Sequence, residues 1–526
     1  MKNYIKNKLT LNRRVLQLKM DINVDISFQD DGKVDLVRNL VERMDLTNLV
    51  NSYANNGRKP AINPITMLEI FIYAFSEGIY SSRGIEKACR FDLRFHYLLD
   101  GQKAPDHSTI SRFHKRLEPF IQDILAENTK VLVYEGHVNL SSIYIDGTKI
   151  EAYANKYSFV WKKAVLKNQE KLRLQVIDFF NLPEGTTLHE IQTLLNKKLQ
   201  AIEKTGSVQS FVKGRGKRKS HEQRDYERFQ SWRERLEKYD EFLQVMGTRN
   251  SFSKTDVDAT FMRMKDDHMR NGQLKPGYNI QLASTGQFII GAYGSHHPND
   301  VLTLPLFLDE LYPRYKGQLD RIVCDSGYES IENYTYLDER NLSSYIKPSN
   351  YEQAKKRSSQ SDISKRENMI YLEEEDCFIC ANGKKLVRVQ DRKKKRASGF
   401  EEVLHRYECN ECNHCPFQKQ CIKYSRCENP QTKRIEFNPS FLVYRQKSYE
   451  NITSEDGITE RINRSIQAEG MFSKLKEGLN YQRFRHKGLR AILCDIHLVA
   501  LGINLNQLHR KLHRNQFEII RYISAA

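Results

Sequence analysis

The 526-residue sequence has no apolar run that approaches the ~20 residues of a membrane-spanning helix. Its basic first residues are not followed by an apolar stretch, so no secretion signal is expected either. Acidic residues are outnumbered by basic ones: 66 Asp and Glu stand against 84 Lys and Arg, which gives a formal net charge of +18. This excess favours a polyanionic partner, because Lys and Arg release condensed counterions when they neutralise phosphates. A soluble basic protein without such a partner would carry the same charge.

Ten cysteines occur in a chain with no expected secretion signal, which favours thiols or metal ligands over disulfides. Six of them form a pattern of short spacings: Cys377, Cys380, Cys409, Cys412, Cys415 and Cys421. Two C-x2-C pairs can close a tetrahedral thiolate site, so the pattern predicts a structural Zn²⁺ held by four of the six, with the first four preferred. An iron–sulfur cluster fits these spacings less well, and free buried thiols are a third possibility.

Three carboxylates far apart in the sequence stand in apolar surroundings. Asp146 and Asp325 each end an apolar run that predicts a buried strand, and Glu469 lies between apolar positions of a helical pattern. An aspartate at a strand end is usually a turn signal. Together, however, the three supply the oxygen ligands that hold a pair of divalent cations such as Mg²⁺. Asp300 is a lesser candidate, which a helix N-cap would explain more simply.

Residues 33–135 are predicted to be helical throughout. Within them, Asp106 or Ser108 begins a helix with an apolar stripe along one face. Its opposite face carries Arg112, Lys115 and Arg116. This arrangement suits the second helix of a helix-turn-helix, although an ordinary amphipathic helix with a solvated cationic face has the same pattern.

The middle of the chain alternates strands and helices in the order strand, hairpin, helix, strand, helix, strand, which is the order of an RNase H-like mixed sheet. Two polar segments interrupt it, and the first contains a cationic, glycine-rich loop at 213–219. We therefore expect a multidomain α/β protein with an N-terminal extension (1–32), a helical domain (33–135), a mixed-sheet core (140–161 and 251–347), a helical insert (162–250), a cysteine-rich insert (348–450) and C-terminal helices that complete the core (451–526).

These features resemble the DDE (Asp-Asp-Glu) transposases of bacterial insertion sequences. The likeness rests on the segments around the three carboxylates and on four further stretches: 105–113, 255–259, 277–281 and 481–485. It extends from about residue 60 to about residue 505. In place of the Tyr and Arg that related transposases often carry before the glutamate, this sequence has Ile462 and Ser465, with Arg461 and Arg464 as near neighbours; Lys476 falls at the expected place after it.

The resemblance implies an enzyme that binds the terminal inverted repeats of its element, cleaves the DNA there and transfers the strands to a target. It assigns Asp146, Asp325 and Glu469 as catalytic ligands of two Mg²⁺ or Mn²⁺ ions. DNA contacts are expected from Arg112, Lys115, Arg116 and Lys476. It also implies a homodimer on double-stranded DNA, in the cytoplasm at the bacterial nucleoid. The alternatives are an RNase H-like nuclease or junction resolvase without strand transfer, and a DNA-binding protein whose catalytic domain has decayed.

Overall fold

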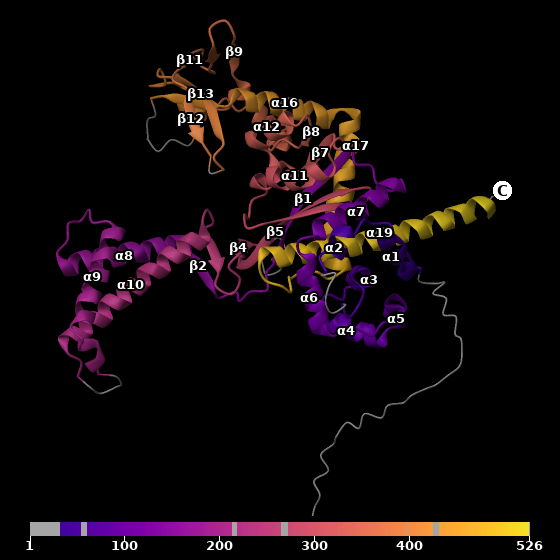
Figure 1. Ribbon diagram of the computed structural model, residues 1–526. Helices are drawn as coiled ribbons and strands as arrows, with labels where there is room; N and C mark the ends of the chain where they lie inside the picture. Colours follow the sequence, from indigo (N-terminus) through magenta and orange to yellow (C-terminus); the bar gives the residue numbers. More distant parts are fainter. Residues whose placement is uncertain are drawn as a thin grey trace, which may run out of the picture.

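The computed structural model describes residues 32–53, 60–212, 218–264, 272–396, 398–423 and 431–524, the last eleven by their backbone alone. The expected N-terminal extension, residues 213–217 of the basic loop and Cys427 lie outside the described residues. The described part contains helices and several sheets, which confirms the predicted mixed α/β class (Figure 1).

The first part of the chain is helical, as predicted. Its helices are α1 (Lys33–Glu42), α2 (Thr47–Asn51), α3 (Pro64–Ser76), α4 (Ser82–Phe91), α5 (Leu93–Leu99), α6 (His107–Leu117) and α7 (Ile121–Tyr134). Short polar side chains begin several of them by accepting a backbone N–H, as Ser81 does for α4 and Asp106 for α6. Asp106 rather than Ser108 is therefore the cap of α6, with an Oδ1 to Thr109 N distance of 2.7 Å.

The central sheet combines antiparallel and parallel strands. It contains β1 (Ser142–Glu151), β4 (Thr260–Arg263), β5 (Leu274–Thr285), β6 (Phe288–Ser295), β7 (Arg321–Cys324) and β8 (Ser343–Ile346). β4 and β6 pair antiparallel with one edge of β5 and β1 with the other, and β7 and β8 follow in parallel. The predicted hairpin at 285–286 is confirmed: Gly286 and Gln287 take the positive φ angles, 58° and 68°, that a tight turn between β5 and β6 requires.

One hydrophobic core joins the N-terminal helices, the central sheet and the last helix, α19 (Leu489–Ser524). Two helices between strands, α11 (Leu304–Leu311) and α12 (Ile331–Glu339), pack against the same core. Helix α3 is apolar on nearly all faces and buries almost all of its residues. A Cβ at Gly502 of α19 would lie 2.8 Å from the backbone nitrogen of Ser76, so glycine is what allows α19 to cross α3 so closely.

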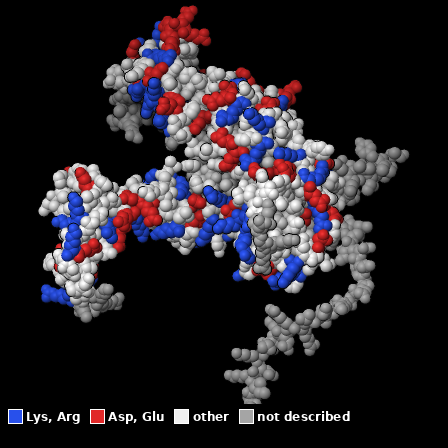
Figure 2. All heavy atoms as spheres, viewed as in Figure 1, with Lys and Arg blue, Asp and Glu red and all other residues white. Residues whose placement is uncertain are grey.

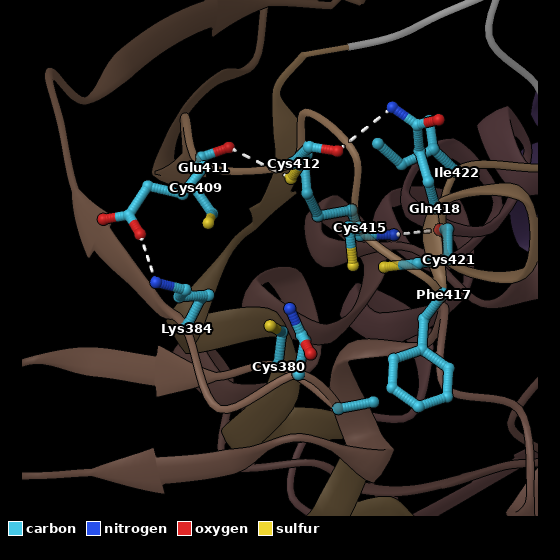
Figure 3. A pocket seen from close by; sticks show the side chains of 13 residues that line it. Cys380, Lys384, Cys409, Glu411, Cys412, Cys415, Phe417, Gln418, Cys421 and Ile422 are labelled. Carbon is cyan, nitrogen blue, oxygen red and sulfur yellow. Dashed lines mark hydrogen bonds and ion pairs between the residues drawn. The ribbon is translucent and has the colours of Figure 1, made fainter.

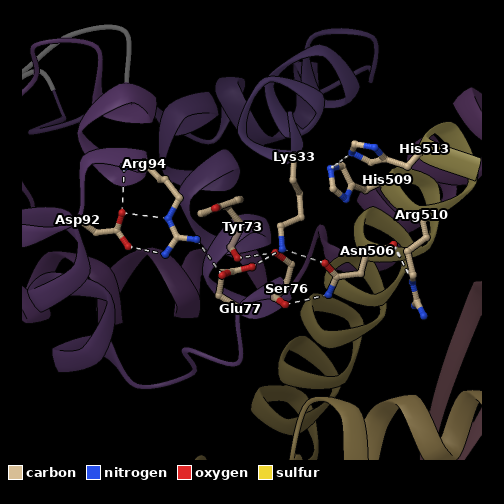
Figure 4. A network of polar contacts seen from close by, with 10 residues as sticks. All are labelled: Lys33, Tyr73, Ser76, Glu77, Asp92, Arg94, Asn506, His509, Arg510 and His513. Atoms are coloured by element: carbon tan, nitrogen blue, oxygen red, sulfur yellow. Dashed lines mark hydrogen bonds and ion pairs between the residues drawn. The ribbon is translucent and has the colours of Figure 1, made fainter. Parts of the chain in front are cut away.

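Polar side chains hold α1, α3, α5 and α19 together at the end of this core (Figure 4). Lys33 forms an ion pair with Glu77 and donates to Asn506 Oδ1 at 3.2 Å. Arg94 Nη1 pairs with the same glutamate at 3.1 Å, and Asn506 Nδ2 donates to the carbonyl of Ser76 at 2.8 Å. The N-terminal helices are thus tied to the C-terminal helix by specific contacts as well as by apolar burial.

Helix α19 corrects the expectation that no stretch approaches a membrane span. Its segment Leu489–His513 is long and apolar enough by length and composition, but 83% of its most apolar window is buried inside the protein. This is the burial of a core helix.

The helical insert forms an arm that projects from the body (Figure 1). Its helices are α8 (Lys162–Phe180), α9 (Leu188–Lys204) and α10 (His221–Met246), with short strands β2 (Phe159–Trp161) and β3 (Ser251–Ser253) at the base and the 3₁₀ turn η1 (Ser207–Ser210). Leu172, Leu195 and Leu236 are fully buried in a small core of its own. The predicted helical character of this segment is confirmed.

The cysteine-rich insert contains a second sheet, which the sequence did not predict. Its strands are β9 (Ile370–Leu372), β10 (Cys377–Ile379), β11 (Lys385–Arg388), β12 (Arg392–Lys395), β13 (Glu401–Cys409) and β14 (Lys433–Phe437). Short helices α13 (Tyr351–Ala354), α14 (Arg357–Gln360) and α15 (Gln418–Cys421) accompany them. Tyr407 stacks on Phe437 at 5.6 Å and meets Phe378 edge-on at 5.0 Å. Strands β10, β11, β13 and β14 each contribute only one or two large side chains to this core, so the sequence contains no long apolar run that would predict it.

The chain then returns to the central sheet through α16 (Pro439–Thr453) and α17 (Glu455–Arg464). The helix predicted around Glu469 is confirmed, and it runs without a break from α17 to Gly478. Its winding changes along the way: a π-helical turn at Ser465–Glu469, the short α18 (Gly470–Ser473) and a second π-helical turn at Lys474–Gly478 follow one another. Single π-turns inside helices are frequent at functional sites.

Candidate active site

Asp146 and Asp325 lie on neighbouring parallel strands. In the β1–β7 pair, Ile145 is opposite Cys324, so the next residue of each chain segment is an aspartate. The sequence predicts that the first strand ends at Asp146; β1 instead continues to Glu151, but the parallel pairing ends here, at the sheet edge where ligand sites of such sheets lie. Asp146 Oδ1 accepts Gly147 N at 2.7 Å and Asp325 Oδ1 accepts Gly327 N at 2.8 Å, which fixes both carboxylates.

Glu469 is linked to Asp146 by Arg464, whose guanidinium group lies close to both carboxylates. Arg464 Nη2 lies 3.2 Å from Glu469 Oε1, and its Nη1 lies 3.8 Å from Asp146 Oδ2. Residues five apart meet across a π-turn, whereas residues four apart meet across an α-helical turn. Arg464 therefore occupies the side of the glutamate where the sequence offset places Ser465. In this chain, an arginine five residues before Glu469 thus contacts it across the π-turn.

The buried thiol of Cys324, which precedes Asp325 and pairs with the residue before Asp146, is affected by the charges of the site. Burial raises the pKa of Cys324 well above its usual value, the carboxylates of Asp325 and Asp146 raise it further, and Arg464 opposes them. Three charged side chains from three elements thus act on one buried group. Asp146 is almost fully buried, while the side chain of Glu469 is 62% exposed, so the cluster is open on the helix side.

A buried polar network lies directly beside Asp146. Asp300 Oδ1 accepts the amide groups of Asn279 at 2.7 Å and Gln281 at 2.8 Å, and Gln281 accepts the hydroxyl of Tyr328. A Cβ on Gly147 would lie 2.6 Å from Asp300 Oδ1, which shows how near this network is to the strand. Asp300 is not a side-chain cap: it is the first residue of the 3₁₀ turn η2 (Asp300–Leu302), and its carboxylate faces the amides instead.

Sequence reasoning missed the roles of Asn279 and Gln281, although the stretch 277–281 carries part of the resemblance. Both are polar residues of a strand that buries its side chains on both faces. A buried polar side chain needs a hydrogen-bonding partner, so two amides at alternate positions of a buried strand are the signal that could have identified the network.

The predicted DNA-contacting residues occupy different surroundings. Arg112 and Lys115 are exposed on α6, opposite its buried stripe of Ile110, Phe113 and Leu117. Arg116 donates to the carbonyl of Ser52 at 2.7 Å and lies 4.2 Å over the ring of Tyr53. Lys476 is half-buried in the second π-turn. Lys476 follows Glu469 by seven residues, which in a regular α-helix would place both side chains on one face. The π-turns change the number of residues per turn, so this spacing does not by itself put them on the same face.

Five cysteine side chains point toward one small cavity in the second sheet (Figure 3). They are Cys380, Cys409, Cys412, Cys415 and Cys421. The cavity has a volume of about 20 Å³, which is room for one water-sized group or ion. Burial and the neighbouring thiol of Cys409 raise the pKa of Cys412 to about 11. Glu411 also lines the cavity, but it is paired with Lys384 at 2.6 Å, and five gathered thiols are the donor set of a soft cation.

Cys377 is not among the residues that line this cavity. It is buried in β10, and its Sγ lies 3.8 Å from Glu375 Oε2. Burial raises the pKa of Cys377, and the nearby Glu375 carboxylate raises it further, because both disfavour the charged thiolate. Strand β10 alternates its side chains, so Cys377 and Cys380, which follows the strand, need not face the same side.

A third cluster, also missed by the sequence analysis, links α6 to α19. The carboxylate of Asp495 lies 2.8 Å from His114 Nε2 and 2.9 Å from His486 Nδ1, and the two imidazole rings stack at 4.1 Å. The ligand atoms of the three residues all lie within 4.8 Å of one another, so they could hold a metal ion. The two distances between the histidine nitrogens and the Asp495 carboxylate are those of charge-assisted hydrogen bonds.

Two protein-family models match the chain. A model described as a transposase DDE domain matches residues 379–509, and a model described as a transposase domain (DUF772) matches residues 23–116. This chain belongs to the DDE transposases of insertion elements. No curated protein and no solved structure matches it. In the transposase, the first match contains Glu469, the cysteine cavity and much of α19, and the second contains α1 to α6.

Proposed function

We propose that the transposase cleaves DNA at the ends of its element and transfers the freed strands, with Asp146, Asp325 and Glu469 as the catalytic carboxylates. The observation that carries this proposal is their convergence: the parallel register of β1 and β7 sets the aspartates side by side, and Arg464 links the first of them to Glu469. The strand order β6-β5-β1-β7-β8 supports an RNase H-like catalytic core.

The three carboxylates fit the divalent cations that the DDE family uses. Ionised carboxylates are acceptors only and suit hard cations such as Mg²⁺ or Mn²⁺. When bound, such ions stabilise the negative charge on the attacking and leaving oxygens of a phosphodiester. Within the chain, Arg464 offsets the mutual repulsion of Asp146 and Glu469, and the backbone N–H groups of Gly147 and Gly327 orient the two aspartates.

The proposed reaction has two steps. Water attacks the phosphodiester at the element end and releases a 3′-OH. This 3′-OH then attacks a phosphodiester of the target DNA, and the target's own 3′-oxygen leaves with a proton. The positioned charges of the site contribute to both steps by stabilising the transition state.

The test is incubation of the purified protein with labelled element ends, target DNA and Mg²⁺. We expect cleavage and strand transfer from the wild type, and loss of both with retained DNA binding from Asp146→Asn, Asp325→Asn and Glu469→Gln. Asp320→Asn, at an exposed aspartate just before β7, is the matched control. Wild-type rates in any triad variant would remove that residue from the site. Cleavage without transfer would indicate a nuclease or resolvase, and no cleavage by the wild type a decayed enzyme.

We also propose a structural Zn²⁺ in the cysteine cavity, held by four of its five lining cysteines. Cys377 belonged to the preferred set from the sequence, but its place beside Glu375 and outside the cavity favours Cys415 or Cys421 instead. Burial raises the pKa of the Cys412 and Cys421 thiols. Because zinc binds the deprotonated thiolate, zinc ligation would lower these pKa values again.

For DNA recognition, we propose that the helical region 33–135 binds the inverted repeats through the exposed face of α6, in the manner of a helix-turn-helix. The exposed Arg112 and Lys115 support this role. Two ends must be held in one complex, so we propose a homodimer on double-stranded DNA, acting in the cytoplasm where the chromosome lies.

A further inference from the structure

A groove without carboxylates runs from α6 to the segment before α19. One of its hollows is lined by the first residues of α4 and α6: Ser81, Ser82, Arg83, His107, Ser108, Ser111 and Arg112. The adjoining hollow shares Ser81 and Ser82 and continues over Tyr80, Tyr153 and residues 480 and 482–486. No Asp or Glu is among these lining residues. In a chain with 66 acidic residues, this absence marks a surface suited to an anion.

The groove presents cations, hydroxyl groups and aromatic rings together. Arg83, Arg112 and Arg485 are exposed along it, and Arg485 lies over the ring of Tyr80 at 5.8 Å. Arg483 and Lys487 lie over the ring of Tyr153 at 5.6 and 5.7 Å. Figure 2 shows Lys and Arg side chains on this side of the body, over α6 and toward the arm. The N-terminus of α4, which is capped by the neutral Ser81, adds the positive end of a helix dipole.

Acidic side chains near the groove are engaged within the protein: Asp106 accepts the N–H of Thr109 at 2.7 Å as the cap of α6, and two glutamates are paired with bases. Glu86 contacts Arg90 and also His107 at 3.0 Å, and Glu151 lies 3.2 Å from Lys275 and 3.6 Å from Arg483. Arg83 and Arg485 have no ion-pair partner among the described residues. Their charge is therefore available to a ligand.

The groove is joined to the candidate active site by β1. Arg483 forms a parallel bridge with Glu151, the last residue of β1, and its side chain donates to the carbonyls of Ala152 and Ala154 at 3.2 Å. Glu151 is five residues beyond Asp146, which corresponds to about 16 Å along a strand. At about 3.4 Å per base pair, that distance spans about five base pairs of DNA.

We propose that this groove binds the sugar–phosphate backbone of the element end, about five base pairs from the phosphodiester that is cut. The inference rests on the proposed function and adds a binding surface that the recognition helix alone does not supply. Arg83 and Arg485 contact phosphates, the serine hydroxyls donate to phosphate oxygens, and Arg483 connects the bound backbone to the strand of Asp146. These contacts position DNA and do not read its sequence.

The test compares two double variants of equal charge change, Arg83→Glu/Arg485→Glu in the groove and Lys130→Glu/Lys447→Glu as the control. The control lysines have side chains 61% and 63% exposed on α7 and α16, away from the lining residues. Binding is measured as a function of salt on a labelled element-end duplex and on a random duplex of equal length. Each lost phosphate contact lowers the slope of log K against log salt by about 0.9.

We expect the groove variant to lose about two units of slope on both duplexes, and to lose hydroxyl-radical protection about five base pairs from the cut. The control keeps both. A groove variant with the slope and footprint of the control overturns the inference while wild-type cleavage still supports the proposed function. A wild type that neither binds nor cuts element ends defeats the proposed function itself. If melting shows that the glutamate variant is unfolded, Arg83→Ala/Arg485→Ala gives the same test.

Discussion

At the residue scale, Arg464 shows how the local winding of a helix decides which side chains meet. The sequence spacing places a serine at the position where relatives carry arginine, and only the π-turn reveals that Arg464 takes over the contact with Glu469. Nothing in the amino-acid pattern distinguishes a π-turn from a regular helical turn. The sequence singles out Glu469, but not the arginine that contacts it.

Arg464→Ala should lower the single-turnover cleavage rate by about ten- to a hundredfold, since hydrogen bonds to charged groups contribute about 1.5–3 kcal/mol. DNA binding should change little. Arg461→Ala is the matched control, because Arg461 lies on the same helix but donates to the hydroxyl of Tyr351 at 3.0 Å. Equal losses in both variants would mean that Arg464 has no special role at the carboxylates.

Two glycines next to the carboxylates provide a second residue-scale prediction. A Cβ on Gly147 would come within 2.4 Å of Gln281 Nε2, whereas one on Gly470 would meet nothing within 4 Å. Gly147→Ala should therefore destabilise the fold by about 1–3 kcal/mol and reduce cleavage, through displacement of the buried amide network. Gly470→Ala, beside Glu469, should fold and cleave normally. Denaturant titration and the cleavage assay decide; a normal Gly147→Ala would show that the network does not support Asp146.

At the element scale, predictions succeeded where one short segment determines its own structure. The cap of α6 and the hairpin between β5 and β6 follow from local chemistry, namely a side-chain acceptor and a tight turn. The second sheet depends on pairing between strands far apart, such as β13 with β11 and β14, so its small core has no local signal. For the same reason the sequence included Cys377 in the preferred ligand set, although strand geometry places it outside the cavity.

The second sheet provides a matched pair of cysteine variants. Cys409→Ser should lower the zinc content of the purified protein and make residues 370–423 sensitive to protease, because metal-binding free energy stabilises such small modules. Cys377→Ser should keep about one zinc per chain. Elemental analysis and limited proteolysis provide the measurements. Zinc loss in Cys377→Ser alone, or full activity without any metal, would contradict the proposed ligand set.

The link between α6 and α19 should make stability depend on pH. The hydrogen bond to Asp495 raises the pKa of His486 against the opposing effect of burial. The protonated ring therefore contributes stability that is fully present below about pH 6.5, the unfolded value, and is lost as pH rises through the raised pKa. Burial opposes ionisation of Asp495, but hydrogen bonds from His114 and His486 lower its pKa, so its contribution is lost only as pH falls well into the acid range.

Thermal melts should accordingly show the wild type losing more stability between pH 6 and pH 9 than His486→Gln does. His189→Gln, at an exposed histidine of α9, serves as the control and should follow the wild type. Parallel pH profiles for all three proteins would show that the His486–Asp495 contact does not contribute.

At the scale of the whole molecule, α19 joins parts that are far apart in the sequence. It contacts α3 at the beginning of the chain and β6 in the middle, and one core contains all three. A fragment that ends at residue 135 would leave the apolar α3 without this partner. We expect such a fragment to bind hydrophobic dyes and to lack a cooperative melting transition. A well-folded fragment by both measurements would show that the helical region is stable without α19.

The position of the cysteine-rich insert also has a consequence in time. During translation, Asp146 and Asp325 are synthesised first, then the whole insert, and only afterwards Glu469 and α19. On the proposed assignment, a chain interrupted anywhere in the insert lacks one carboxylate and the helix that completes its core. Under this assignment, a truncated chain would lack the complete set of carboxylates, so only the finished polypeptide would cut DNA.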